Sequence, residues 1–151
     1  MNTSKEKIRD FFNEKTIGII GVSRNEKHFS RMVYKGFKKK GFEVVPVNPK
    51  AEKINEDLCY KDLASLPENV KTLIIMKKII DVDTFVKVAI EKGIHKIWIQ
   101  QNTESEQLLK LLEQGNIPFV SGKCAFMYLE PVGGIHGFHR FLSKTFGKFE
   151  E

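Results

Sequence analysis

The sequence predicts an α/β protein with a Rossmann-like, doubly wound parallel sheet of five strands and helices on both faces. Two observations support this prediction. Short, nearly all-apolar, β-branched runs alternate with amphipathic segments of roughly 10 to 15 residues. The first run, T-I-G-I-I-G-V-S over 16–23, also ends in a glycine-flanked turn just before a helix-like segment. Such a turn directs backbone N–H groups and the positive end of a helix at one point, where a phosphate group typically binds.

The N-terminal segment 4–13 has its apolar residues at helical spacing, which predicts a short amphipathic helix. An apolar strand over 17–22 follows. After a polar loop, Ser30 is expected to cap a helix that runs to about Lys40, because serine hydroxyls accept the free N–H groups of a first helical turn. The apolar run 43–47 predicts the second strand.

Beyond a polar crossing, the pattern predicts one helical turn within 60–66 and a third strand over 71–76. A helix is expected to begin at Asp81 and to run to about Lys92, since its apolar residues recur at helical spacing and a glycine closes it. The run 96–100 predicts the fourth strand.

Thr103 followed by Glu106 fits a capping box and predicts a helix to Gln114, and the fifth strand is expected over 117–120. In a doubly wound sheet, ligands bind beyond the carboxyl ends of the strands, where the strand order reverses. The loops after the strands should therefore form one candidate site. These loops begin at Gly21, Val47, Met76, Ile99 and Val120.

The chain has 151 residues, 41% of them hydrophobic, which suits one domain with a single core. We expect that domain to span 1–151, with a core at about 16–130 and a C-terminal extension at 131–151. The apolar runs are shorter than the roughly 20 residues of a membrane span, and the N-terminal residues are too polar for a secretory signal. We therefore expect no membrane partner. With only two cysteines and no Cys-x-x-Cys pair, reduced thiols and a cytoplasmic location are expected.

The net charge of +6 is compatible with a nucleic acid or with a small anionic ligand such as a nucleotide. The densest basic run, 38–40, lies at the end of a predicted helix, where cations interact favourably with the helix dipole. Most aromatic residues fall on core-facing positions, whereas surfaces that bind nucleic acid interleave basic residues with exposed aromatic ones. We therefore expect a small-molecule partner rather than a nucleic acid. Nucleic-acid binding is kept as an alternative hypothesis.

Two familiar phosphate-binding motifs are absent. The dinucleotide fingerprint G-x-G-x-x-G is replaced by Gly18-x-x-Gly21, and no Walker loop G-x-x-x-x-G-K-[ST] occurs. The two glycines are therefore open to a second interpretation, in which they only allow a strand and a helix to pack closely.

The end of the second strand differs from that of dinucleotide enzymes, which usually place an Asp or Glu there to hold the ribose hydroxyls. The segment 47–50 reads V-N-P-K, so no carboxylate repels a phosphate, and Lys50 can attract one. With Arg24, Lys27 and Arg31 near the first turn, the residues favour a ligand with several phosphates, including a phosphorylated ribose.

Several segments together carry a family resemblance. They are G-V-S-R-N at 21–25, F-S-R-M-V at 29–33, V-V-P-V-N-P-K at 44–50, Y-K-D-L-A-S-L-P at 60–67, W-I-Q at 98–100, and Cys124. In order and spacing the chain resembles the small stand-alone CoA-binding proteins, whose domain is similar to the CoA-binding domain of the succinyl-CoA synthetase alpha subunit. The resemblance covers about 16–130 and implies that coenzyme A or an acyl-CoA is the ligand.

The resemblance also implies how the ligand lies over the loops. The pyrophosphate would meet Gly21, Val22, Ser23, Arg24 and Ser30. The adenosine and its ribose phosphate would be bordered by Val47, Asn48, Pro49 and Lys50. The pantetheine arm would pass Met76, Lys77 and Gln100.

Cys124 has two interpretations. Its thiol would lie near the CoA sulfur and form a mixed disulfide or sense thiol state, or it is a small residue used for packing. His136 and His139 have a spacing that can hold a metal on a helix, but Gly137 lies between them and no hydrolytic zinc motif is completed. No metal is therefore expected. These histidines are either structural or contacts to a phosphate or a partner chain.

The expected function is the binding of coenzyme A or an acyl-CoA. We expect a non-catalytic binding or regulatory protein rather than an enzyme. The residues show no nucleophile triad or paired carboxylates. An NADP-dependent oxidoreductase or redox-sensing domain is the alternative, since the 2′-phosphate of NADP also attracts a cation. Phe138, Phe141 and Phe146 are expected to dock the C-terminal extension onto the body or onto a second copy, so a homo-oligomer stays open.

Overall fold

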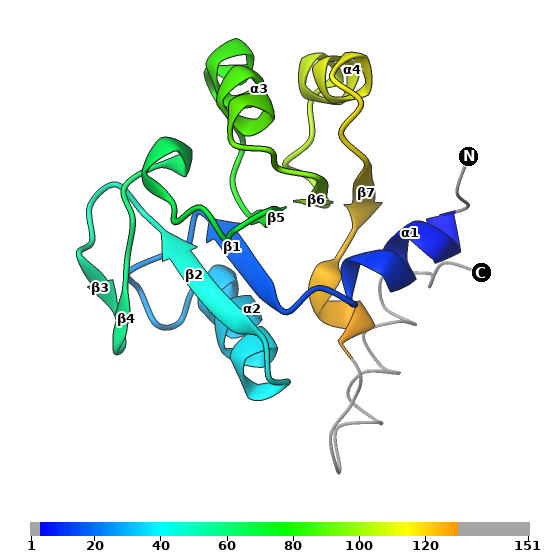
Figure 1. Ribbon diagram of the computed structural model, residues 1–151. Coiled ribbons are helices and arrows are strands. Elements are labelled where there is room, and N and C mark those ends of the chain that lie inside the picture. The colour runs from blue at the N-terminus through cyan, green and yellow to red at the C-terminus, as the bar shows by residue number, and fades with distance from the viewer. Residues whose placement is uncertain (1–3, 130–151) are drawn as a thin grey trace.

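The computed structural model describes residues 4–129, which form a five-stranded parallel sheet between two layers of helices (Figure 1). The strands are β1 (Thr16–Ile20), β2 (Glu43–Val47), β5 (Thr72–Ile75), β6 (Lys96–Gln100) and β7 (Phe119–Lys123). Every neighbouring pair is parallel, and the order across the sheet is β2-β1-β5-β6-β7. The predicted fold class is confirmed.

The strand order reverses between β1 and β5, because the chain leaves β1 toward β2 and later returns to place β5 on the other side of β1. Ile20 at the end of β1 is in register with Val47 of β2 and with Ile75 of β5. The three segments that follow these residues therefore begin at the same edge of the sheet. A doubly wound sheet binds ligands at such a reversal.

The two faces of the sheet are covered by different helices (Figure 1). On one face lie α1 (Ser4–Phe11), α2 (Phe29–Lys39) and the 3-10 helix η2 (Ala125–Tyr128), and on the other lie η1 (Leu63–Ser65), α3 (Val82–Glu91) and α4 (Glu106–Gln114). Adjacent strand residues alternate between the layers, since Ile74 packs with the first set and Ile75 with the second. Both faces are buried, which explains the nearly continuous apolar strands.

Gly18 has the packing role that the sequence allowed as an alternative to phosphate binding. A Cβ at this position would lie 3.0 Å from Val70 Cγ1 and 3.1 Å from Leu73 Cδ2. Its φ lies outside the left-handed region, so the requirement is one of space. Gly18 therefore lets the chain around Val70 pack closely against the centre of β1.

Two of the predicted helix caps were wrong by two residues. His28, not Ser30, is the N-cap of α2, and its Nδ1 accepts the N–H of Ser30 at 3.1 Å. Ser105, not Thr103, caps α4, because its Oγ accepts the N–H of Leu108 at 3.2 Å. Thr103 instead donates its hydroxyl to the carbonyl of Gln100 in the preceding turn. The last strand is also displaced, since β7 runs over Phe119–Lys123 rather than 117–120.

A two-stranded hairpin, β3 (Lys53–Ile54) and β4 (Asp57–Leu58), was not predicted. It follows β2 and lies outside the main sheet, at the left in Figure 1. Asn55 in its turn has a φ of 54°, a conformation that asparagine tolerates better than most residues. The strands are too short and too polar to show a periodic pattern.

Within residues 4–129, no helix is both long and apolar enough to pass through a lipid bilayer. The predictions for His136, His139 and the three phenylalanines of the C-terminal extension lie outside the described residues.

Candidate ligand-binding site

The first loop of the site begins at Gly21, which has a φ of 95°. The N–H groups of Gly21 and Val22 both donate to the carbonyl of Val47, at 3.0 and 3.2 Å. A Cβ on Gly21 would stand 2.9 Å from Cγ of Lys77. Glycine is thus required here by backbone conformation and by space, and the stem of Lys77 rests on the turn. We call the loops 21–28, 47–50 and 76–81 together the strand-end site.

Three consecutive carbonyls of the first loop are held by side chains. Asn48 Nδ2 donates to the carbonyl of Val22 at 2.8 Å. Arg31 Nη1 donates to the carbonyls of Ser23 and Arg24, at 3.2 and 3.3 Å. Because a trans peptide directs its C=O and N–H in opposite directions, the N–H of Arg24 points away from the Arg31 guanidinium.

The amides of this loop are only partly free. The N–H of Ser23 donates to Ser30 Oγ at 2.8 Å, and that of Asn25 donates to Ser23 Oγ at 3.0 Å. The N–H groups of Gly21 and Val22 already bind Val47. Most of the backbone N–H groups predicted to bind a phosphate are therefore occupied by bonds within the protein. A phosphate at this loop would therefore depend more on side chains than the glycine motif suggests.

The start of α2 lies beside this loop and is organised by His28 and Ser30. His28 Nδ1 accepts the N–H of Ser30 and lies 2.9 Å from Ser30 Oγ. These contacts assign the imidazole proton to Nε2, so the Ser30 hydroxyl donates to Nδ1 and accepts from Ser23. Ser30 is fully buried, and it connects the helix end to the loop.

Asn48 explains why no carboxylate stands at the end of β2. Its Nδ2 donates to the carbonyl of Val22, and its Oδ1 accepts the N–H of Lys50 at 2.7 Å. Its own N–H donates to the carbonyl of Tyr60 at 2.9 Å. An ionised aspartate has no donor and would leave the Val22 carbonyl facing a negative charge. Hydrogen bonding thus requires an asparagine at position 48. The side chain of Lys50 is exposed to solvent.

The remaining predicted residues lie along the edge from β5 to β7. The N–H of Met76 donates to the carbonyl of Ile20 at 2.8 Å, which joins the loop after β5 to β1. Gln100 is buried, and its Oε1 accepts the N–H of Ala125 at 3.0 Å. Cys124 is also buried and immediately precedes η2. The structure therefore brings Gln100 and Cys124 together at the β6–β7 end of the edge.

The second cysteine, Cys59, is a structural residue. Burial raises the pKa of its thiol, an effect that a backbone hydrogen bond with Asn48 only partly offsets. A raised pKa disfavours the reactive thiolate at neutral pH.

Charge at the strand-end site is positive. Its exposed cationic side chains are Arg24, Lys27, Lys50, Lys77 and Lys78, and they outnumber its exposed carboxylates, Glu26 and Asp81. Among residues 4–129, no group of three or more His, Cys, Asp or Glu side chains is arranged to hold a metal ion. Positive side chains around a sheet reversal suit a ligand with several phosphates.

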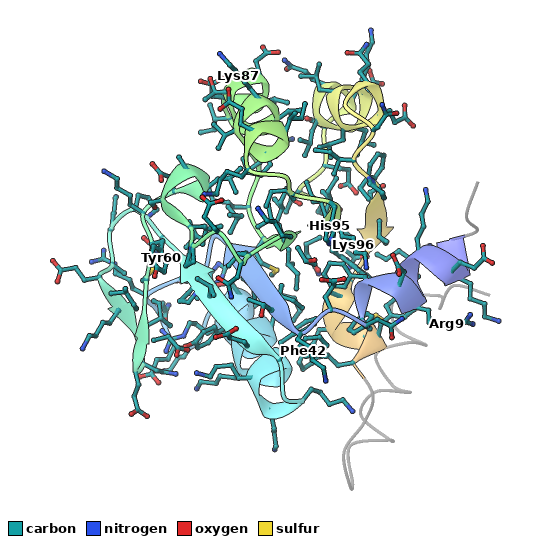
Figure 2. The ribbon with its side chains drawn as sticks, viewed as in Figure 1. Arg9, Phe42, Tyr60, Lys87, His95 and Lys96 are labelled. Carbon is teal, nitrogen blue, oxygen red and sulfur yellow. The ribbon has the colours of Figure 1, made fainter. Side chains whose placement is uncertain are left out.

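A groove of about 810 Å³ lies elsewhere, near the amino ends of β1 and β2. In Figure 2, Arg9 and Phe42, which line it, lie on the side of α1 and α2, whereas Tyr60 lies beyond β2 toward the hairpin. This groove includes none of the predicted site residues. Ligands of doubly wound sheets typically meet the carboxyl ends of the strands, whereas this groove lies near the amino ends.

The fold and the strand-end site together define a nucleotide-binding Rossmann-like domain. The chain belongs to the CoA binding domain family, whose sequence model matches residues 15–130. This confirms the resemblance seen in the sequence.

Three relatives illustrate the family. Acetate–CoA ligase (ADP-forming) II of Archaeoglobus fulgidus is 31% identical over 102 residues, which are 66% of this chain and 15% of that protein. The uncharacterized Bacillus subtilis protein YneT is 25% identical over 127 residues, 82% of this chain and 92% of that protein. A solved structure of a conserved hypothetical protein from Pyrococcus furiosus has a TM-score of 0.66 at 29% identity, covering 75% of this chain and 97% of that one. The domain thus occurs both alone and within a much longer ligase.

Proposed function

We propose that the chain binds coenzyme A or an acyl-CoA at the strand-end site, as a non-catalytic binding or regulatory protein of the cytoplasm. Membership in the CoA binding domain family supports the ligand class. The observation that carries the proposal is the meeting of the loops after β1, β2 and β5 at the reversal of strand order, where Gly21 bonds to Val47 and Lys77 rests on Gly21.

The three parts of the ligand are distributed over the site as follows. The pyrophosphate lies against the first loop and the start of α2, at Gly21, Val22, Ser23, Arg24, Lys27 and Ser30. The adenosine and its ribose phosphate lie against Val47, Asn48, Pro49 and Lys50. The pantetheine arm follows the edge past Met76 and Lys77 toward Gln100 and Cys124.

The ligase activity named for the Archaeoglobus protein is not part of the proposal. The aligned region spans only 15% of that protein, so the similarity does not carry the activity of the whole protein over to this chain. Binding is the function that the described residues support by themselves.

Thermal unfolding of the purified protein with CoA, dephospho-CoA, NADP and NAD tests the proposal. A ligand at about 100 times its Kd stabilises the fold by about 2.7 kcal/mol, which is readily measured. We expect CoA to stabilise more than dephospho-CoA, because Lys50 interacts with the additional ribose phosphate. Greater stabilisation by NADP than by CoA would contradict the proposal and favour the oxidoreductase alternative.

The variant Lys50→Ala tests the position of the ribose phosphate. It should reduce the difference between CoA and dephospho-CoA by about 1 kcal/mol, since one solvent-exposed ion pair is lost. Lys87→Ala is the matched control, because Lys87 is an exposed lysine on α3, away from the strand-end site (Figure 2). An equal effect of both substitutions would show that only the net charge matters.

Treatment with CoA disulfide tests whether the pantetheine arm reaches Cys124. In that reaction the Cys124 thiolate attacks one sulfur of the disulfide, forms a mixed disulfide and releases one CoA thiolate. Mass spectrometry should find one CoA adduct on Cys124 and none on Cys59. An unmodified Cys124 would remove it from the proposed site and assign it to packing.

A further inference from the structure

Arg31 differs from the other cations near the first loop because it is buried, with 3% of its surface exposed. Within residues 4–129, no carboxylate lies within ion-pairing distance of its guanidinium, and its Nε has no hydrogen-bond partner. A buried charge is costly unless polar groups surround it. The acceptors that compensate Arg31 are two main-chain carbonyls and one side-chain amide.

These acceptors come from two different segments. Nη1 donates to the carbonyls of Ser23 and Arg24 in the loop after β1. Nη2 donates to Asn55 Oδ1 at 2.8 Å, in the turn of the hairpin that follows β2. One planar guanidinium thus joins the first loop of the strand-end site to the hairpin. A lysine has a single nitrogen and cannot reproduce this fork.

The hairpin is also fixed to α2 near Arg31. Tyr34 lies three residues further along the helix, with its ring 5.9 Å from the Arg31 guanidinium carbon. Its hydroxyl donates to the carbonyl of Ile54 at 3.0 Å and to the carboxylate of Asp57. Lys38 Nζ forms an ion pair with the same carboxylate at 2.5 Å. The hairpin therefore offers Arg31 an anchored acceptor rather than a free loop.

We propose that Arg31 is a positioning residue for the ligand, an inference that rests on the proposed function. By holding the carbonyls of Ser23 and Arg24 inward, it directs the N–H of Arg24 outward, toward the side where the ligand phosphates bind. By binding Asn55, it also fixes this loop relative to the segment after β2. Arg31 acts without touching the ligand, because it is buried and both of its Nη groups donate to the protein.

The test compares CoA affinity, measured by calorimetry at several salt concentrations, among four variants. Arg31→Gln removes the fork, Arg31→Lys keeps the charge, and Arg24→Gln removes an exposed cation proposed to meet the pyrophosphate. Asn55→Gly removes the acceptor while keeping a residue that tolerates the φ of 54°. Circular dichroism and thermal unfolding of each variant show whether it is folded.

We expect Arg31→Gln to weaken CoA binding about tenfold, the equivalent of one hydrogen bond to a charged group. Arg31→Lys should not restore the affinity. Asn55→Gly should weaken binding less, and combining it with Arg31→Gln should add nothing, because both remove the same link. The salt dependence should stay unchanged in the Arg31 variants and decrease in Arg24→Gln, since only an exposed cation is screened by salt.

Asn55→Gly remains informative if Arg31→Gln fails to fold. Wild-type affinity in the folded Arg31 and Asn55 variants would overturn the role of Arg31, as would a salt dependence that decreases in Arg31→Gln as it does in Arg24→Gln. If the wild-type protein itself binds no CoA, the proposed function fails, and the ligand-positioning role of Arg31 fails with it.

Discussion

Lys77 packs directly against Gly21, so closely that a Cβ on the glycine would lie 2.9 Å from Cγ of the lysine. The two residues follow β1 and β5, the neighbouring strands between which the order of the sheet reverses. At the reversal, Gly21 provides the backbone turn after β1, and Lys77 provides an exposed cation after β5. The contact therefore joins two of the three loops of the proposed site.

Gly21→Ala should destabilise the protein through both backbone strain and steric overlap. A non-glycine residue at a φ of 95° costs of order 1–3 kcal/mol, and the overlap with Lys77 adds to this. Gly41→Ala is the matched control, because Gly41 has a φ of 102° but nothing within 4 Å of its Cβ position. Urea unfolding should show a larger loss for Gly21→Ala. Equal losses would mean that the contact with Lys77 has no energetic weight.

His28→Ala should lower the free energy of unfolding by about 1 kcal/mol, since the N-cap acceptor of α2 is lost. His28→Asn should lose much less, because an asparagine Oδ1 can accept the N–H of Ser30 in place of the imidazole Nδ1. Chemical denaturation at pH 7.5 compares the variants. The same stability in both would show that His28 does not act as a cap.

Asn48→Asp preserves the shape of the side chain and removes its donor. The Val22 carbonyl would then face a carboxylate across 2.8 Å, so we expect a loss of about 1–3 kcal/mol in folding stability. The added negative charge beside Lys50 should also weaken CoA binding. Calorimetry and urea unfolding measure the two effects separately. Unchanged stability would contradict the structural role assigned to the amide.

Stability should fall at acidic pH through Glu14. A hydrogen bond from Lys96 holds the pKa of this carboxyl below its usual value of 4.5, more strongly than partial burial raises it. Glu14 Oε2 lies 2.7 Å from Lys96 Nζ. A lowered folded-state pKa gives stability that is present above the unfolded pKa and is lost as the pH falls through the folded one.

Lys96→Met should reduce that loss. Unfolding measured between pH 3 and 6 should show a flatter profile for the variant than for the wild type, because Glu14 then lacks the partner that favours its charged form. His95→Gln is a useful comparison, since His95 lies 3.7 Å from Glu14 and ranks below Lys96 among the groups that lower its pKa. A profile unchanged by Lys96→Met would contradict the assignment.

The local details of the site show where sequence reasoning fails. The hydroxyl of Ser30 was expected to cap α2, but that hydroxyl accepts from Ser23 in the preceding loop while His28 forms the cap. Thr103 and Glu106 matched a capping box, yet the chain turns first and begins α4 after Ser105. Several residues near each helix start can accept an N–H, and the path of the preceding loop decides which one does.

The sequence by itself determined the order of strands and helices and the edge where their loops meet. Hydrophobic periodicity is a local property, and the carboxyl ends of parallel strands share one edge. Only the tertiary structure decided that Arg31, expected near the phosphates, is buried against the carbonyls of the loop after β1 and reaches Asn55, 24 positions along the chain. A guanidinium is buried when distant carbonyl and amide oxygens converge on it, and that convergence exists only after the hairpin has packed against α2.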